Sequence, residues 1–297
     1  MIQVYGLGQC TLDHLAILPS YPKPDTKCEF REMTVQGGGP AATAMVALSR
    51  WGIRCAFAGA VGDDAIGAQI RRTLDDEGVD TSGLLVRRGS GSQFAFIAVE
   101  AGTGRRTIFW RRPSGAAPAA NELDRELIRQ AKVVHTDGLY VEASVAAARM
   151  VREAGGQVVV DAGTLRDGSL ELAKESDCFI ASAGFARALI GEDRPLDACR
   201  RLAELGPRVV GVTRGEKGYV ALDRGMVIKR PAYRVKAVDT TGCGDVFHAG
   251  FIYGLVQGWD AGPCLDFGAW AAARVSLRPG GRDGIPSLAD WPERKLV

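Results

Sequence analysis

The sequence has few of the residues that build metal sites and disulfide frameworks. Its seven cysteines are scattered singly without a CxxC pair, and its three histidines lie far apart. Zinc sites and disulfide networks need such residues in close groups, so we expect neither, and unpaired cysteines suit a reducing compartment. The chain starts directly in a strand-like run with no signal peptide before it, so we expect a cytoplasmic protein.

Excess charge and long apolar runs are also missing. The 37 basic and 35 acidic side chains leave a net charge of +2, and no basic stripe is interleaved with aromatic residues. We therefore expect neither nucleic acid nor a membrane as a partner. No apolar run approaches the roughly 18 residues that a membrane span needs. A Walker-type GxxxxGK(S/T) motif is absent as well, which excludes a P-loop nucleotide site.

Short β-branched runs alternate with longer helical patterns along most of the chain. This alternation predicts an α/β fold with a doubly wound, mostly parallel, Rossmann-like sheet and helices on both faces. Length and the lack of a long linker predict a single domain over residues 1–297. We expect strands at 4–8, 55–59, 132–136, 157–161, 178–181 and 208–213, and helices at 40–50, 65–77, 122–130, 142–153 and 196–205.

Two stretches, about 12–35 and 92–112, break this rhythm. They alternate apolar and polar residues over short runs without a helix between them, and 93–110 is typical of a hairpin with its turn at 102–104. Insertions of this kind predict a small β-sheet lid. Its aromatic residues Phe94, Phe96, Phe109 and Trp110 are too many to leave in water on an isolated flap, so we expect two lids to pack in a homodimer.

The most informative segment is DTTGCGDVFHAGF at residues 239–251. We expect a strand to end near 238 and, after a glycine turn, an apolar helix to begin near Gly244. The N–H groups of Gly242, Cys243 and Gly244 would then form an anion site at the helix start. Asp245 in that place suits a base that accepts a hydroxyl proton during phosphoryl transfer. The alternative is that Asp245 only caps its helix and the glycines only make a turn.

The residues around this loop change the balance between those two interpretations. DTTGCGDVFHAGF closely resembles the C-terminal signature of ribokinase-like, or PfkB-type, carbohydrate kinases, with Cys243 where that family usually has alanine. GGGPAATA at 37–44, continued by GAVGDDAIG at 59–67, resembles the N-terminal signature of the family. TRGEKG at 213–218 is similar to its TxGxxG nucleotide turn. Asp13 matches an aspartate that holds sugar hydroxyls. The four features come in the family's order and span nearly the whole chain.

The resemblance implies an ATP-dependent sugar kinase that uses Mg²⁺ and phosphorylates a hydroxymethyl group. It places the sugar at Asp13, Gly38, Gly39 and Thr43, and the nucleotide at Thr213, Gly215 and Gly218. It also implies a monovalent cation, K⁺, at Asp239 and Thr241 beside the 278–284 loop. The metal-ordering Asn-x-x-Glu of many members is replaced by SAGF at 182–185, which leaves Asp161 and Glu192 as open alternatives for Mg²⁺.

The substrate is the least determined feature. Lys27 and Arg111 lie in the lid-like stretches and could hold an anionic or polyhydroxylated substrate. The 37–44 and 278–286 segments are similar to sulfofructose kinases, and 104–108 with 283–285 resembles ketohexokinase, which favours a ketose or another furanose-like sugar. Two alternatives stay open: a nucleoside kinase, and a catalytically silent sugar- or nucleotide-binding protein on the same scaffold.

Overall fold

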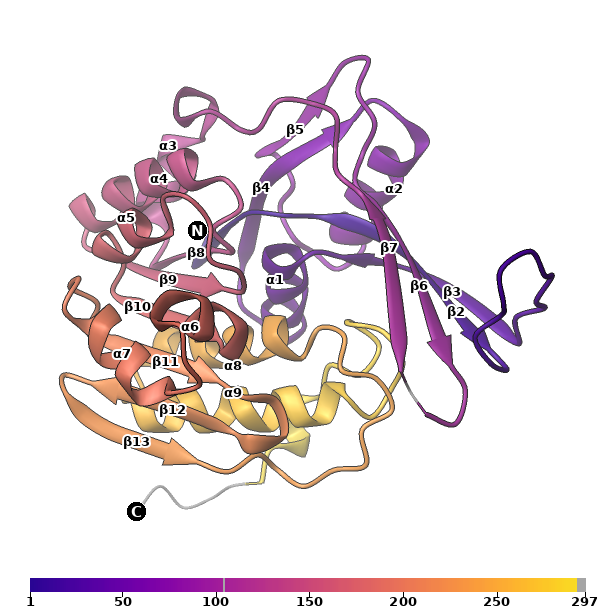
Figure 1. Cartoon of the computed structure of the whole chain (residues 1–297). Coiled ribbons are helices and arrows are strands. Elements are labelled where there is room, and N and C mark those ends of the chain that lie inside the picture. The colour runs from indigo at the N-terminus through magenta and orange to yellow at the C-terminus, as the bar shows by residue number, and fades with distance from the viewer. Residues whose placement is uncertain (104, 293–297) are drawn as a thin grey trace.

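The computed structural model describes residues 1–103 and 105–292. Its body is a nine-stranded sheet that consists of β1 (Val4–Leu7), β4 (Cys55–Gly62), β5 (Leu84–Arg87), β8 (Val133–Thr136), β9 (Gln157–Ala162), β10 (Cys178–Ser182), β11 (Val209–Thr213), β12 (Tyr219–Asp223) and β13 (Met226–Arg230). The strand order is β13-β12-β11-β10-β9-β8-β1-β4-β5, and the strands from β11 to β5 are parallel (Figure 1). The predicted doubly wound, mostly parallel sheet is confirmed.

Helices cover both faces of this sheet, because its buried strands are apolar on both sides. Neighbouring residues of one strand enter opposite cores: Val4 and Phe57 pack in one, Tyr5 and Ala58 in the other. The first core is completed by α1 (Pro40–Arg50), α2 (Ala65–Asp75), α8 (Cys243–Val256) and α9 (Ala261–Val275). The second is completed by α3 (Arg125–Gln130), α4 (Val141–Glu153), α5 (Ser169–Lys174), α6 (Ala183–Ile190) and α7 (Pro195–Ala203).

A second, four-stranded sheet projects from the body as the predicted lid. Its strands are β2 (Thr11–Leu18), β3 (Glu32–Gly38), β6 (Phe94–Glu100) and β7 (Arg106–Arg111), in the order β3-β2-β6-β7. The β6–β7 pair is the predicted hairpin, with Ile97 opposite Ile108. Gly104, in the turn predicted at 102–104, and residues 293–297, at the end of the predicted domain, lie outside the described residues.

The strand that we expected before Asp239 does not form. Residues 231–238 have no regular structure and are mostly exposed, so they lack the buried face that would hold a strand against a sheet. Instead, the backbone N–H groups of Val238 and Asp239 donate to the carbonyl of Ser276 at the end of α9, at 2.7 and 3.2 Å. The position of the chain before the 239–244 loop is therefore set by the end of a helix.

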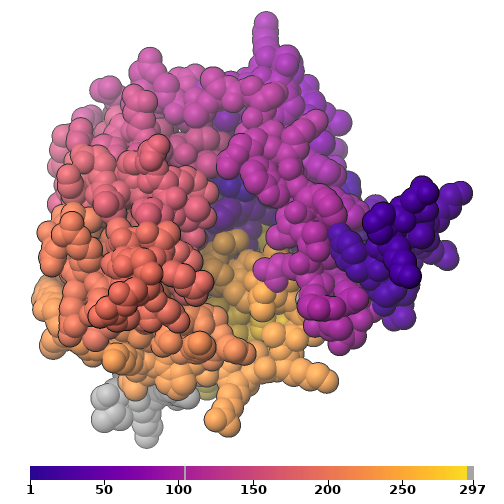
Figure 2. All heavy atoms as spheres, in the orientation of Figure 1, coloured from indigo at the N-terminus to yellow at the C-terminus, as the bar shows by residue number. Residues whose placement is uncertain are grey.

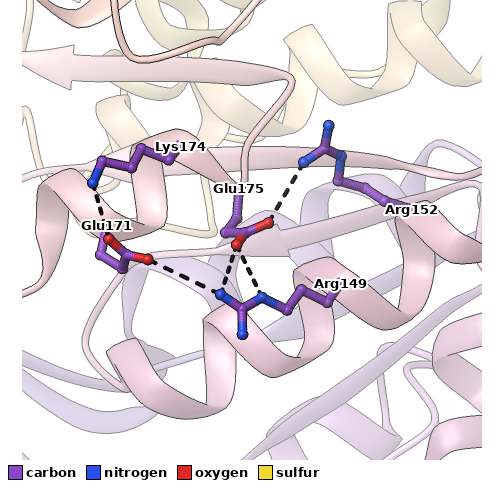
Figure 3. A network of polar contacts seen from close by, with 5 residues as sticks. All are labelled: Arg149, Arg152, Glu171, Lys174 and Glu175. Atoms are coloured by element: carbon purple, nitrogen blue, oxygen red, sulfur yellow. Dashed lines mark hydrogen bonds and ion pairs between the residues drawn. The ribbon is translucent and has the colours of Figure 1, made fainter.

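Ion pairs on the surface link α4 to the end of α5 (Figure 3). Arg149 and Arg152 of α4 contact Glu175, at 2.8 and 3.6 Å, while Arg149 also lies 4.0 Å from Glu171. Such exposed pairs contribute little to stability individually. None of these residues is among the cavity-lining residues described below. Among the described residues, no helix is both long and apolar enough to cross a membrane.

Candidate active site

The main cavity of the described residues lies between the lid and the carboxyl ends of the parallel strands. Its volume is about 330 Å³. Figure 2 shows this face of the molecule hollowed between the pink segments on one side and the purple lid on the other. Gln9 follows β1 and Arg166 follows β9, so the cavity lies where ligands bind in open α/β sheets. The remaining lining residues include Asp13, Gly38, Gly39, Thr43, Gln93, Ile108, Trp110, Arg112, Thr241, Asp245 and Gly281.

The lid strand β2 and the glycine turn before α1 place Asp13 in this cavity. A side chain at Gly38 would overlap the Asp13 carboxylate, so the close approach requires glycine there. Asp13 is buried, and its Oδ1 has no hydrogen-bond partner among the described residues. Burial raises the pKa of Asp13 to about 6. A buried acceptor without a donor is costly, so this oxygen is available to the hydroxyl groups of a ligand.

The glycine-containing loop at 239–244 leads into α8, with Gly242 directly before the helix. The φ of +75° at Gly242 and the Gly281 backbone, with Cα 2.5 Å from the position that a Cβ would occupy, both require glycine. Helix α8 begins at Cys243, and its first helical hydrogen bond runs from Val246 N–H to Gly242 carbonyl at 2.9 Å. The N–H groups of Gly244 and Asp245 precede that bond and lie at the positive end of the helix dipole. The loop has the form of an anion site.

Asp245 lines the cavity beside this helix start. Burial raises its pKa to about 8, and the negative charges of Asp161, Asp137 and Asp13 act in the same direction, whereas Arg282 lowers it. The side chain is half-buried with one side on the cavity. A carboxyl group with a pKa near neutrality is suited to accept and release a proton at physiological pH.

Of the two acids considered for the metal, the structure brings only Asp161 toward Asp245. Burial raises the pKa of Asp161, and its Oδ2 lies 3.3 Å from Nδ1 of His248. The same Nδ1 lies 2.8 Å from the carbonyl of Gly244, so His248 links Asp161 to the first turn of α8. Glu192 is exposed and pairs with Arg194 at 2.6 Å. No group of three or more metal-ligating side chains occurs among the residues that the structure describes.

The other residues predicted to bind substrate fall into two groups. Gly38, Gly39 and Thr43 line the cavity with Asp13. Lys27 and Arg111 do not: Lys27 is exposed in the loop between β2 and β3, which extends to the far right in Figure 1. Arg111 instead lies beside the carbonyl of Ser92, to which its Nη2 donates at 3.4 Å.

The residues predicted to bind the nucleotide lie outside the lining of this cavity. Thr213 ends β11, and its Oγ1 donates to the Ala181 carbonyl at 3.4 Å. Gly215 begins a 3₁₀ turn (Gly215–Lys217), and Gly218 follows with a φ of +78°. The three residues therefore share one turn at the carboxyl end of β11.

Arg112 and Arg166 are the basic residues of the lining, whereas the sequence-based prediction placed Arg111 at the substrate. On β7, Ile108 and Trp110 face the cavity, so the alternation of a strand places Arg112 on the same side and Arg111 on the other. The Arg112 guanidinium lies 4.8 Å from the centre of the Trp110 ring. The alternation of side chains along a strand, in which every second residue faces the same side, could have identified Arg112 from the sequence. Nothing in the local sequence indicates that Arg166 reaches this cavity.

Asp239 and Thr241 lie at the base of the lid. Asp239 Oδ1 accepts hydrogen bonds from the N–H of Thr241 at 2.9 Å and its Oγ1 at 2.8 Å. Oδ2 accepts from Gly280 N–H at 2.8 Å. Arg106 of β7 reaches the same loop: its Nη1 donates to Thr240 Oγ1 at 2.5 Å and lies 3.6 Å from Asp239 Oδ1.

The chain is similar to curated sugar and nucleoside kinases. The chain is 26% identical to a ribokinase of Haemophilus influenzae, over 97% of the chain and 96% of the relative. It is 26% identical to a nucleoside kinase of Methanothermobacter thermautotrophicus, over 97% and 94%, and 31% identical to fructokinase-1 of Oryza sativa subsp. japonica, over 74% of each.

Solved structures show the same fold. A ribokinase from Thermotoga maritima superposes with a TM-score of 0.84 at 24% identity, covering 97% of each chain. A ribokinase from Arabidopsis thaliana gives 0.82 at 23% identity, covering 97% of this chain and 96% of its own. Residues 1–288 match the family described as pfkB family carbohydrate kinase. The chain therefore belongs to the pfkB family of carbohydrate kinases, which are phosphotransferases that act on an alcohol group.

Proposed function

We propose that this protein transfers the γ-phosphoryl group of ATP to a hydroxymethyl group of a ketose or a similar furanose-like sugar, with Asp245 as the general base. The observation that carries the proposal is that one cavity joins Asp245, the start of α8 and the unpaired oxygen of Asp13. A sugar hydroxyl that donates to Asp13 would hold the ring, so that another hydroxyl faces Asp245.

The character of the cavity favours a sugar over a nucleoside. Its volume of about 330 Å³ is at the small end of the range for ligand pockets. Among the described residues, Trp110 is the only aromatic side chain in its lining. One indole ring suits the apolar face of a monosaccharide, whereas a purine ring would be expected to have aromatic neighbours on more than one side.

Each side chain then has a defined part in the reaction. Asp245 accepts the proton of the acceptor hydroxyl, while the N–H groups of Gly244 and Asp245 at the start of α8 stabilise charge on the moving phosphoryl group. The N–H of Cys243, which we expected to share this role, donates to the Thr240 carbonyl at 3.4 Å instead. Arg166 lines both the sugar cavity and a small cleft beside Asp161, so we assign it to the transferred phosphoryl group. Arg112 and Trp110 are assigned to the acceptor. The lid excludes water, which would otherwise accept the phosphoryl group.

The acidic residues near the loop fit a divalent cation. Asp161, Asp137 and Asp13 each raise the pKa of Asp245, so several carboxyl groups lie near the start of α8. Asp161 would hold Mg²⁺, which would supply positive charge against the negative charge of the transferred phosphoryl group. The turn of Thr213, Gly215 and Gly218 would hold the nucleotide. In support, the A. thaliana ribokinase was solved with ribose and ATP, and a fold neighbour from E. coli, 22% identical, with ATP and Mg²⁺.

The outer face of the lid suits a second copy of this chain. Phe109 contacts Phe96 with ring centroids 6.3 Å apart, and Phe94 contacts His14 at 5.0 Å. Phe109 is 52% exposed on this face. Trp110, which we had grouped with these residues, faces the cavity instead. We propose that two outer faces pack together in a homodimer, since apolar patches of this kind are rarely left exposed.

A screen of ATP consumption would test the proposal, with ketoses, aldoses, sugar acids and nucleosides as acceptors and Asp245→Asn as the control. We expect turnover with a ketose or furanose-like sugar, and NMR of the product should place the phosphate on a hydroxymethyl carbon. Turnover only with nucleosides would support the nucleoside-kinase alternative. Sugar binding without turnover by any acceptor would support a silent binding protein.

A further inference from the structure

The carboxylate of Asp239 ties together the two loops beneath the lid. Its side chain is 1% exposed. Oδ1 holds the N–H and hydroxyl groups of Thr241, in the loop that leads to α8, and Oδ2 holds the N–H of Gly280. The position of this carboxylate therefore sets where the anion site begins relative to the 278–284 segment. The family resemblance places a monovalent cation beside it.

A guanidinium of the lid already lies in that place. Arg106 is on the same side of β7 as Ile108 and Trp110, which face the cavity. Its Nη1 lies 3.6 Å from Asp239 Oδ1 and donates to Thr240 Oγ1 at 2.5 Å. Its positive charge is also felt in the catalytic loop, where it lowers the pKa of Cys243 against the larger opposing effect of burial. This contact joins the lid to the loop before α8.

These contacts do not fit a bound K⁺. Asp239 Oδ1 is occupied by two donors of Thr241, and the guanidinium supplies a positive charge next to it. A potassium ion beside Asp239 would be repelled by the Arg106 guanidinium at short range, since the Asp239 side chain is 1% exposed, while that of Arg106 is 30% exposed. The buried carboxylate is thus balanced by a residue of this chain.

We propose that Arg106 is a positioning residue that acts as a tethered cation: when the lid is closed, its guanidinium takes the place of a monovalent ion beside Asp239. The guanidinium then holds the loop before α8 in its active shape, and K⁺ is not required. The kinetic part of this inference rests on the proposed kinase activity. The binding part does not, because it concerns only the charge beside Asp239.

Rates in KCl and in tetramethylammonium chloride at equal ionic strength would test the kinetic part. The wild type should turn over equally in both salts. In the organic salt, the kcat of Arg106→Gln should be about tenfold below that of the wild type. K⁺ should raise the kcat of this variant about fivefold, which is a usual scale of coupling between two sites. Arg106→Lys should keep the indifference to K⁺. The matched control is Arg105→Gln, since the ion pair of Arg105 among the described residues is with Glu100 on the same hairpin, at 3.1 Å, and this variant should keep wild-type rates.

Melting temperatures of the substrate-free protein in the same salts would test the binding part without any activity. An ion that binds the folded state raises its melting temperature, so K⁺ should stabilise Arg106→Gln but neither the wild type nor Arg105→Gln. Strong activation or stabilisation of the wild type by K⁺ would overturn the inference. So would an Arg106→Gln enzyme that is slow but not restored by K⁺, or one that matches Arg105→Gln. If the melting result holds and no acceptor is phosphorylated, the proposed function fails while the site assignment stands.

Discussion

Asparagine in place of Asp245 should make the folded protein more stable at neutral and alkaline pH. The variant keeps the size of the side chain but cannot ionise. In the wild type, burial and the neighbouring carboxylates raise the pKa of Asp245 from 3.8 to about 8. Between those values the folded state binds more protons than the unfolded chain, so wild-type stability falls as the pH rises, and the asparagine variant lacks this loss.

The size of the effect follows from the displacement of the pKa. From about pH 5 to pH 8, three pH units at roughly 1.4 kcal/mol each give an upper value of ~4 kcal/mol. Asp245 is only half-buried and borders the cavity. Water in the cavity screens its charge, so we expect a measured difference of about 2 kcal/mol between the two ends of this range.

Urea unfolding of the wild type and Asp245→Asn across this pH range would measure the difference. The variant should gain free energy of unfolding relative to the wild type steadily as the pH rises. Asp76→Asn is the matched control, because Asp76 is exposed at the end of α2, and it should follow the wild-type profile. A stability difference that stays constant with pH, or a variant less stable than the wild type at pH 8, would refute the reasoning.

Three other changes test the assignments around the cavity and the lid. Burial, with the charges of Asp245 and Asp239, raises the pKa of Cys243 to about 12. Its thiol should therefore resist alkylation at neutral pH, and Cys243→Ala should keep its activity. Rapid inactivation of the wild type by an alkylating reagent, prevented by Mg-ATP, would contradict this. Arg112→Ala should raise the KM for the sugar about tenfold with a smaller effect on kcat, and an unchanged KM would remove Arg112 from substrate binding. Phe109→Asp should convert a dimer to a monomer in light scattering, and a wild type that is already monomeric at micromolar concentration would disprove the dimer.

The sequence was most informative where local chemistry alone sets the structure. The helix predicted at 40–50 is α1 (Pro40–Arg50), because Pro40 suits the first helical turn and Gly39, with a φ of +94°, marks its start. The glycine turn before α8 was recognised for the same reason. Helix α9 was not predicted: Gly262 and Pro263 in its first turn resemble a loop, and tertiary packing against α8 overrides that preference.

The site itself could be predicted only in part. Asp13, Gly38 and Asp245 came from motifs, and the structure places all three on one cavity. The prediction placed Arg111 at the substrate, but Arg112 lines the cavity, because neighbouring residues of the strand face opposite sides of the lid. Which side faces the cavity depends on the pairing register of the lid strands, which the sequence leaves open. The contact between Arg106 and Asp239 joins residues far apart in the chain. It depends on how the lid lies over the body, which no local pattern indicates.

The central claim is that Asp245 is the general base of a sugar kinase. The kcat of a variant without this carboxylate tests the claim most directly. The wild type and Asp245→Asn would be compared with Mg-ATP and the sugar that the acceptor screen identifies, with ATP binding measured by calorimetry. The account predicts a loss of about 10²–10⁴-fold in kcat with ATP affinity retained. A variant that binds ATP and keeps more than about a tenth of wild-type turnover would contradict it.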